Sequence, residues 1–460
     1  MDVSQDTVGT ESRPDTITEP STDWRPLTRI AFRFCFLYFG LFCLWFAQIT
    51  FVFTGPLAVL LPAGAVQWQM LLTDPSSRWV GRQLFGVDAQ LHPGSGSGDQ
   101  AAIWIAMFCL LVIAVLGTVV WSLLDRRTSG YPELAVWFRV FLRLCLGGQM
   151  LFYGAAKVVP TQMPEPPLTA LLQPFGEFSP ASVLWLQVGS SHPYEMALGA
   201  VEVVAGLLLF VPRTATFGAL LSLLSMAQVF LLNMTFDVPV KILSSHLLLI
   251  SAVLLAPQAR RLFDAVVLQR ACEPVPVPPL FAGARANRWA VGVQVALGIW
   301  VLAGLLLQSW QAWGSYGGGR PKPELYGIWS VRTFALDGHA VAPLTTDENR
   351  WQRLVFDEVG AVTFQSMDGR LHTAPAALDA GARTLALTTP LPTPDGTTAP
   401  VPDPTPFADL HYQQPDPDRL TLTGTLRCAP VRIELDRVDP NTFPLRNRGF
   451  HWVQEYPYFR

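Results

Sequence analysis

Residues 101–124 read AAIWIAMFCLLVIAVLGTVVWSLL and contain no charged side chain. At about 1.5 Å of rise per residue, a helix of this length crosses the roughly 30 Å hydrocarbon core of a bilayer. Over the chain, 50% of the 460 residues are hydrophobic and only 15% are charged, and the first two-thirds hold nearly all of the long apolar runs. Typical soluble domains carry roughly 25% charged residues. The sequence therefore predicts an integral membrane protein.

Further apolar stretches are long enough to cross a membrane, which requires about 17–25 residues. Together with the first, they lie at residues 30–53, 101–124, 134–158, 194–211, 214–233, 242–257 and 289–310. A weaker stretch at 57–72 is interrupted by proline, with Pro56 and Pro62, and is expected to form a re-entrant or interfacial helix. We therefore predict a helical membrane domain at residues 25–313 with about seven crossings.

The arginines between these stretches indicate the orientation of the chain. Those that fall on one side are Arg25, Arg29, Arg126, Arg127, Arg213, Arg260, Arg261, Arg270, Arg285 and Arg288. Loops rich in arginine stay in the cytoplasm, so the N-terminus is expected inside and the C-terminal region outside the plasma membrane. Residues 1–24 are polar and lack the apolar core of a secretory signal. They are expected to form a disordered cytoplasmic tail.

A short Gly/Pro linker at residues 314–324 leads into a region with the composition of a soluble domain. Its expected strands lie at residues 328–336, 351–356, 361–365, 371–373, 384–387, 409–412, 420–426 and 431–435, with turns at Asp337-Gly338, Asp368-Gly369 and Asp395-Gly396. This spacing favours an antiparallel meander closed into a barrel, with a sandwich as the alternative. The opening GIW at 327–329 resembles the GxW start of lipocalin-like barrels.

The expected extracytoplasmic domain spans residues 325–460. Its final segment is rich in aromatic residues and arginine. Residues 443–460 read FPLRNRGFHWVQEYPYFR, whereas free termini are usually polar. The segment is expected to dock across the outer mouth of the helical bundle, where Trp and Tyr suit the headgroup region. Packing on the barrel surface is the alternative.

Two ionisable residues lie near the middle of adjacent crossings. Arg143 and Glu202 are at similar distances, roughly 12–13 Å, from the starts of their apolar stretches. Gly147, Gly154 and Gly199 allow the two helices to approach closely. We therefore expect a buried Arg143–Glu202 ion pair, which either fixes the fold or takes part in chemistry.

Polar residues also gather near the outer ends of the crossings. They are Asp99, Lys157, Glu177, Asp237, Lys241 and His246. Asp99 is expected to cap the helix that begins at residue 101, and Asp237 to cap the sixth crossing. Two of the three lysines belong to this group, and lysine can lose its proton whereas arginine does not. The sequence predicts an outer-mouth polar cluster of Asp99, Glu177 and Asp237 with Lys157, Lys241 and His246.

Several classes of function lack their usual signals. The net charge of −3 gives no reason to expect nucleic acid as a partner. The six cysteines contain no CxxC pair, and only Cys428 is expected outside, so a dithiol mechanism within the chain is disfavoured. No HExxH, P-loop or GxSxG motif and no metal-spaced cluster is present in the sequence.

Residues of about 139–257 resemble the DoxX-like family of multi-pass bacterial membrane proteins. The similar motifs are RLCLG at 143–147, FYGAAK at 152–157 and EVVAGLLLFVPRTA at 202–215, and His246 matches a polar position of the last family helix. The resemblance implies a four-helix core and a link to thiosulfate:quinone oxidoreduction or thiol-stress complexes. It also implies a quinone site between the helices.

Two functions therefore remain as hypotheses. The first is a quinone-linked membrane oxidoreductase or redox-complex subunit, in which Lys157, Glu202, Lys241 and His246 bind quinone or relay protons. The second is a non-enzymatic membrane scaffold whose exported barrel binds a lipophilic ligand or a protein partner. In both, the lipid bilayer is the surrounding partner.

Overall fold

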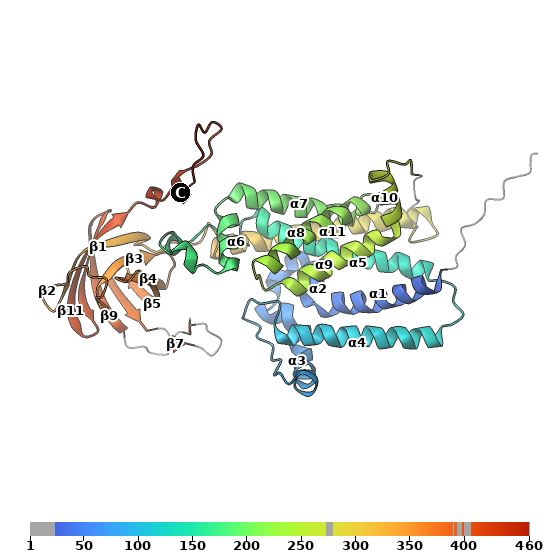
Figure 1. Cartoon of the computed structure of the whole chain (residues 1–460), viewed down its shortest axis with the longest axis horizontal. Coiled ribbons are helices and arrows are strands. Elements are labelled where there is room, and N and C mark those ends of the chain that lie inside the picture. The colour runs from blue at the N-terminus through green and yellow to red at the C-terminus, as the bar shows by residue number, and fades with distance from the viewer. Residues whose placement is uncertain (1–23, 273–278, 390, 393–397, 400–405, 460) are drawn as a thin grey trace, which may run out of the picture.

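The computed structural model describes residues 24–272, 279–389, 391–392, 398–399 and 406–459. A bundle of helices and a β-barrel lie end to end (Figure 1). We call the end of the bundle next to the barrel the barrel-side end, and the end that carries α10 (Ala259–Val266) the distal end. Residues 1–23 of the predicted tail and the predicted turn at Asp395-Gly396 lie outside the described residues.

The predicted crossings are confirmed as helices. Within the described ranges, seven helices are long and apolar enough to cross a membrane. They are α1 (Pro26–Trp45), α4 (Ala101–Leu124), α5 (Pro132–Val158), α7 (His192–Phe210), α8 (Ala215–Thr235), α9 (Lys241–Leu255) and α11 (Ala284–Ser315). The sixth continues beyond α9 through η6 (Ala256–Gln258) into α10. The chain is therefore built as a multi-pass membrane protein.

Short helices connect the crossings. They are α2 (Ala47–Phe51), η1 (Val52–Leu60), η2 (Ala63–Gln67), α3 (Trp68–Val80), η3 (Gly81–Phe85), η4 (Leu168–Leu171), η5 (Phe175–Glu177) and α6 (Pro180–Gly189). At η1 the chain packs closely against α11. Gly55 of η1 has a φ of +56°, and a Cβ added at Gly304 of α11 would lie only 2.1 Å from the carbonyl carbon of Gly55. Residues 57–72 therefore form short helices broken near Pro62 instead of one crossing, as expected.

The C-terminal domain is a closed antiparallel barrel of eight strands, which decides between the barrel and the sandwich. Its strands are β1 (Gly327–Leu336), β3 (Trp351–Phe356), β4 (Ala361–Ser366), β5 (Leu371–Asp379), β6 (Thr384–Thr388), β9 (Pro406–Asp416), β10 (Arg419–Leu426) and β11 (Ala429–Val438). Each pairs with the next, and β11 pairs back with β1. Short strands β2 (His339–Ala340), β7 (Leu391–Pro392) and β8 (Thr398–Ala399) lie outside this ring of pairings.

The interior of the barrel is a packed hydrophobic core. Trp329 of the GIW motif is buried, and its Nε1 donates a hydrogen bond of 2.9 Å to the carbonyl oxygen of Leu325. The guanidinium of Arg437 lies 5.9 Å from the centre of the Trp329 ring, within cation–π range. Alternate residues of the strands fill the remaining interior, including Phe334, Trp351, Phe356, Leu387, Leu422 and Ile433.

The barrel is held against the bundle by the loop between α5 and α6. Leu168 of η4 is fully buried against Ile328 and Val355 of the barrel. Its N–H donates a hydrogen bond of 2.9 Å to Oδ2 of Asp357, whose Oδ1 accepts another of 2.7 Å from Arg320. The barrel therefore contacts the bundle directly as well as through the chain that follows α11.

The chain after the barrel forms two short helices, η7 (Pro440–Thr442) and α12 (Pro444–Asn447). The prediction that the aromatic C-terminal segment docks across the mouth of the bundle is wrong for the residues that follow them. Arg446 of α12 forms an ion pair of 3.3 Å with Glu165 in the α5–α6 loop. Beyond Gly449, whose φ is +57°, the chain loops out and folds back on itself, so that the ring of Tyr458 lies 4.7 Å from the guanidinium of Arg448 (Figure 1). Trp452 and Phe459 are consequently 90% and 91% exposed.

Candidate functional site

Helices α5 and α7 approach each other through glycine. A Cβ added at Gly154 would lie 2.7 Å from the backbone nitrogen of Val203, and one at Gly199 would lie 2.7 Å from the carbonyl oxygen of Gly154. Small residues allow membrane helices to reach this backbone-to-backbone contact. The crossing places Lys157, near the end of α5, opposite the middle of α7.

Lys157 forms a buried ion pair with Glu202 at this crossing. Its Nζ lies 2.6 Å from Oε2 of Glu202, and the two side chains are only 6% and 5% exposed. The predicted Arg143–Glu202 pair is therefore wrong. The glycine contacts place Glu202 beside Gly154 of α5. At 1.5 Å per residue, Gly154 lies roughly 16 Å along α5 from Arg143, so Arg143 is too far from Glu202 to pair with it.

Arg143 faces α11 instead of α7. Its guanidinium donates to Oε1 of Gln294, a buried amide in an apolar crossing that no sequence motif marks. The Nε2 of Gln294 in turn donates to the carbonyl oxygen of Ala290 at 3.0 Å. Arg143 therefore belongs to the distal half of the bundle, apart from the Lys157–Glu202 pair.

A second buried carboxylate lies on the same face of α7. Glu195 has no exposed surface, and its Oε1 accepts a hydrogen bond of 3.0 Å from the N–H of Met163. Its Oε2 has no hydrogen-bond partner among the described residues. A Cβ at Gly199 would touch Cβ of Lys157, and Gly199 lies one turn from both Glu195 and Glu202. Lys157 therefore packs against the face of α7 that carries both carboxylates, and helical spacing in the sequence already places Glu195 on that face.

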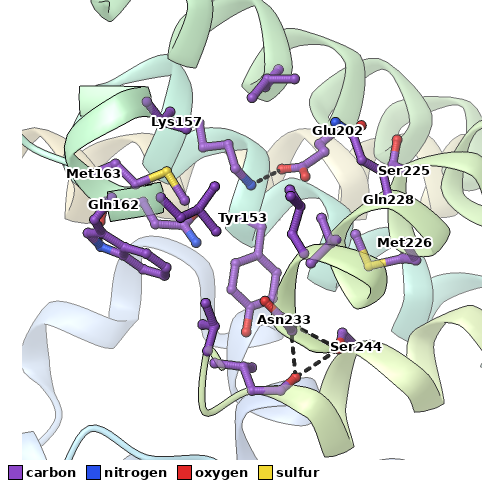
Figure 2. Close-up of a pocket in the computed structure, with 18 of the residues that line it drawn as sticks. Tyr153, Lys157, Gln162, Met163, Glu202, Ser225, Met226, Gln228, Asn233 and Ser244 are labelled. Carbon is purple, nitrogen blue, oxygen red and sulfur yellow. Dashed lines mark hydrogen bonds and ion pairs between the residues drawn. The ribbon is translucent and has the colours of Figure 1, made fainter. Parts of the chain in front are cut away.

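The ion pair lines a cavity of about 270 Å³ between α5, α6, α7, α8 and α9 (Figure 2). Its apolar lining includes Leu184, Val188, Leu198, Met226, Val229 and Leu247. Its polar lining includes Tyr153, Lys157, Gln162, Glu202, Asn233 and Ser244. A mainly apolar pocket with a few converging polar groups is the usual form of a small-molecule site.

Tyr153 adds a hydroxyl group to the cavity (Figure 2). Its ring lies 5.7 Å from Nζ of Lys157, and its hydroxyl oxygen accepts a hydrogen bond of 3.2 Å from Nε2 of Gln48. Because the oxygen acts as the acceptor there, the hydroxyl hydrogen is left to donate elsewhere. No signal in the sequence marks Tyr153 as a polar group of a site, since a tyrosine in a crossing is commonly a packing residue.

Lys241 belongs to a second polar group at the barrel-side end. Asp99 caps α9 and not α4 as predicted, because its two carboxylate oxygens accept the N–H groups of Lys241 and Ile242 at 2.8 and 2.9 Å. The Nζ of Lys241 lies 2.9 Å from Asp237 and 3.7 Å from Asp99. These contacts fix the start of α9, so the predicted capping role of Asp237 is taken by Asp99.

His246 forms a third site. Its ring stacks on Phe42 with centroids 4.1 Å apart. Its Nδ1 lies 2.7 Å from the carbonyl oxygen of Ile242, and its Nε2 lies 2.8 Å from the hydroxyl of Tyr38. A carbonyl oxygen only accepts, so Nδ1 carries the proton and Nε2 accepts from Tyr38. Both nitrogens are occupied, which fits a structural role.

The outer-mouth cluster predicted from the sequence is therefore divided. Asp99, Asp237 and Lys241 meet, whereas Glu177 lies on η5 with an exposed side chain. The cavity lined by Lys157 and Glu202 has neither Lys241 nor His246 among its described lining residues. The cavity is the arrangement best suited to bind a ligand.

Comparisons with known proteins identify a relative for part of the chain. No model of a known protein family matches, and no solved structure matches. The uncharacterized protein YwoB of Bacillus subtilis (strain 168) is 33% identical over 128 residues, which cover 75% of YwoB and 26% of this chain. The similarity therefore extends over most of the relative. This chain belongs to the same protein family as YwoB.

Proposed function

We propose that the helical domain binds a lipid-soluble quinone in this cavity and acts as a quinone-linked membrane oxidoreductase or a subunit of a membrane redox complex. The observation that carries the proposal is the buried Lys157–Glu202 pair in the wall of a largely apolar cavity. Ionisable residues inside membranes are rare and commonly mark ligand or proton pathways. A ligand for this cavity must combine solubility in lipid with hydrogen bonding.

The polar groups of the cavity match the carbonyl oxygens of a quinone. The ammonium of Lys157 carries three N–H donors, and Glu202 receives one of them. The remaining donors and the hydroxyl of Tyr153 suit a ligand that only accepts hydrogen bonds. Apolar side chains such as Leu184 and Val188 suit the ring and the start of its prenyl chain.

Reduction of a bound quinone consumes two electrons and two protons and yields the quinol. In this proposal, the electrons come from a redox centre of a partner protein in the same complex. Lys157 gives a proton to a quinone oxygen, and Glu202 accepts and passes on the replacement protons. Glu195 lies about two turns farther along α7, toward the barrel-side end, and extends this series of groups.

The position of the cavity within the chain supports the same proposal. Its described lining residues run from Tyr153 to Leu247. They fall within residues 139–257, the region that resembles the DoxX-like family. The resemblance implies a quinone site between these helices, and the cavity lies between them.

Organic extraction of the purified full-length protein tests the proposal. We expect wild type to release stoichiometric quinone, detected by mass spectrometry. In Lys157→Met/Glu202→Met the amount should fall by about tenfold or more, because charged hydrogen-bonding groups are lost from the site. Lys241→Met is the matched control, because Lys241 lies outside the lining, and it should retain quinone. Wild type carrying only bulk phospholipid, or equal quinone in all three proteins, would count against the proposal.

We further propose that the barrel faces outward from the plasma membrane, as the distribution of arginine indicates. Cys428 is exposed on the barrel, and Cys272 follows α10 at the distal end. A membrane-impermeant maleimide applied to intact cells is therefore expected to label Cys428 and to reach Cys272 only after permeabilisation. The reverse pattern would place the barrel in the cytoplasm.

A non-enzymatic scaffold is the alternative. It is favoured by one observation, the exposed aromatic segment that includes Phe450, Trp452 and Phe459, which suits a protein partner. The packed core of the barrel gives less support to a lipophilic ligand within it. In this alternative, Glu202→Gln lowers stability and leaves the quinone content of the preparation unchanged.

A further inference from the structure

The distal end of the bundle contains a second cavity, of about 660 Å³. It lies between the first half of α5, the turn from α7 to α8, the end of α9 and the start of α11. Three arginines line it, Arg139, Arg143 and Arg213. In the part of the chain that the structure describes, no aspartate or glutamate lines the cavity. The cavity therefore concentrates positive charge.

Arg143 is the group that most needs an anion. The residue is 8% exposed, it donates to the neutral amide of Gln294, and its Nε is buried without a hydrogen-bond partner among the described residues. Arg33, also buried in the bundle, differs because the carboxylate of Asp125 lies 3.9 Å from its guanidinium. A buried cation that lacks a counter-charge is unfavourable, because burial removes its hydration.

We propose that this cavity binds the phosphate group of an anionic ligand, either the headgroup of an acidic phospholipid or free phosphate. The planar guanidinium groups of arginine form paired, charge-assisted hydrogen bonds with phosphate oxygens. Gln258 adds an amide group to the lining, whereas the amide of Asn287 is engaged by backbone groups of Phe281 and Gly283. Val136, Val140 and Val291 are apolar and suit the start of an acyl chain.

The surroundings of the cavity suit the headgroup zone of a bilayer. Helix α10 combines arginines with exposed apolar side chains, including Phe263 and Val266. Trp137 packs edge-on against Phe281 with centroids 5.7 Å apart, and Trp289 is exposed nearby on α11. Amphipathic helices and tryptophans of this kind lie at the membrane interface, and basic pockets between crossings bind acidic headgroups.

Native mass spectrometry of the full-length protein in detergent tests the inference. The probes are phosphatidylglycerol, phosphatidylcholine with the same acyl chains, and inorganic phosphate. We expect wild type to prefer phosphatidylglycerol over phosphatidylcholine, and Arg139→Gln/Arg213→Gln to reduce phosphatidylglycerol binding by about thirtyfold, the factor expected for two arginines near a headgroup. Should the double variant fail to fold, Arg213→Gln alone replaces it in the test, because Arg213 is exposed. We expect this single variant to reduce phosphatidylglycerol binding by a smaller factor.

Arg126→Gln/Arg127→Gln is the matched control, because it removes two exposed arginines outside the cavity. It should keep the wild-type preference. Displacement of the lipid by millimolar phosphate would support the site and assign it to free phosphate, whereas resistance would assign it to the lipid. Equal binding of the two lipids without phosphate binding, or the same loss in the control as in the cavity variants, would overturn the inference.

Discussion

Replacing Lys157 with methionine is expected to lower the free energy of unfolding by about 3–5 kcal/mol. The change leaves the carboxylate of Glu202 without its partner in an environment where both side chains are nearly inaccessible to solvent. Equilibrium unfolding in mixed micelles measures the loss. Lys241→Met is the matched control, and about 0–1 kcal/mol is expected for it, because its closer partner Asp237 is 85% exposed and its other partner, Asp99, still accepts the backbone N–H groups at residues 241 and 242.

The double variant Lys157→Met/Glu202→Met distinguishes the effect of the two charges on stability from the effect of side-chain packing. Because both charges are removed together and side-chain volume is largely kept, most of the lost stability should return. Quinone should still be missing, because the hydrogen-bonding groups are absent. A double variant that is stable and keeps its quinone would show that the pair serves the fold alone.

Substituting Gly154 with alanine is expected to destabilise the bundle by about 1–3 kcal/mol, the usual range for overpacking. The added Cβ would lie 2.7 Å from the backbone nitrogen of Val203 and 2.9 Å from the carbonyl oxygen of Gly199. Neither atom is part of a flexible side chain, so the two helices must separate. Because this crossing positions Lys157 against Glu202, quinone content should fall with stability.

Gly292→Ala provides the control for this prediction. Gly292 lies in α11, another long apolar helix, and a Cβ there would meet nothing within 4 Å. Alanine is favoured over glycine in helices by about 1 kcal/mol, so the control should be neutral or slightly more stable. Equal destabilisation by both substitutions would indicate that the effect does not arise from the α5–α7 contact.

The crossings and the barrel were predictable because their signals are local. A helix is recognised by a long apolar run, and the turn at Asp337-Gly338 by residues that accept positive φ, here +52° and +78°. The strand β5 was predicted too short because Pro375 interrupts the pattern. Pro375 is tolerated because the pairing of β5 with β4 ends there, and pairing with β6 begins at Ala376.

The candidate site was only partly predictable, because its geometry depends on contacts between helices. Lys157 and Glu202 were both selected from the sequence as ionisable residues within crossings. Their pairing was missed because hydropathy defines the ends of a crossing too loosely to fix the depth of a side chain. The contact of Gly154 with Val203 sets that depth, and only the packed structure reveals it.

Photolabelling with an azido-quinone tests most directly whether the cavity beside Lys157 and Glu202 binds quinone. The full-length protein is illuminated with the probe, digested and mapped by mass spectrometry, with and without excess unlabelled quinone. We predict labelled peptides from residues 153–163, 184–202 and 225–247, which line the cavity, and loss of this labelling with excess quinone. Labelling that falls mainly on the lipid-exposed helix at residues 101–124 and resists competition would contradict a quinone site in the bundle.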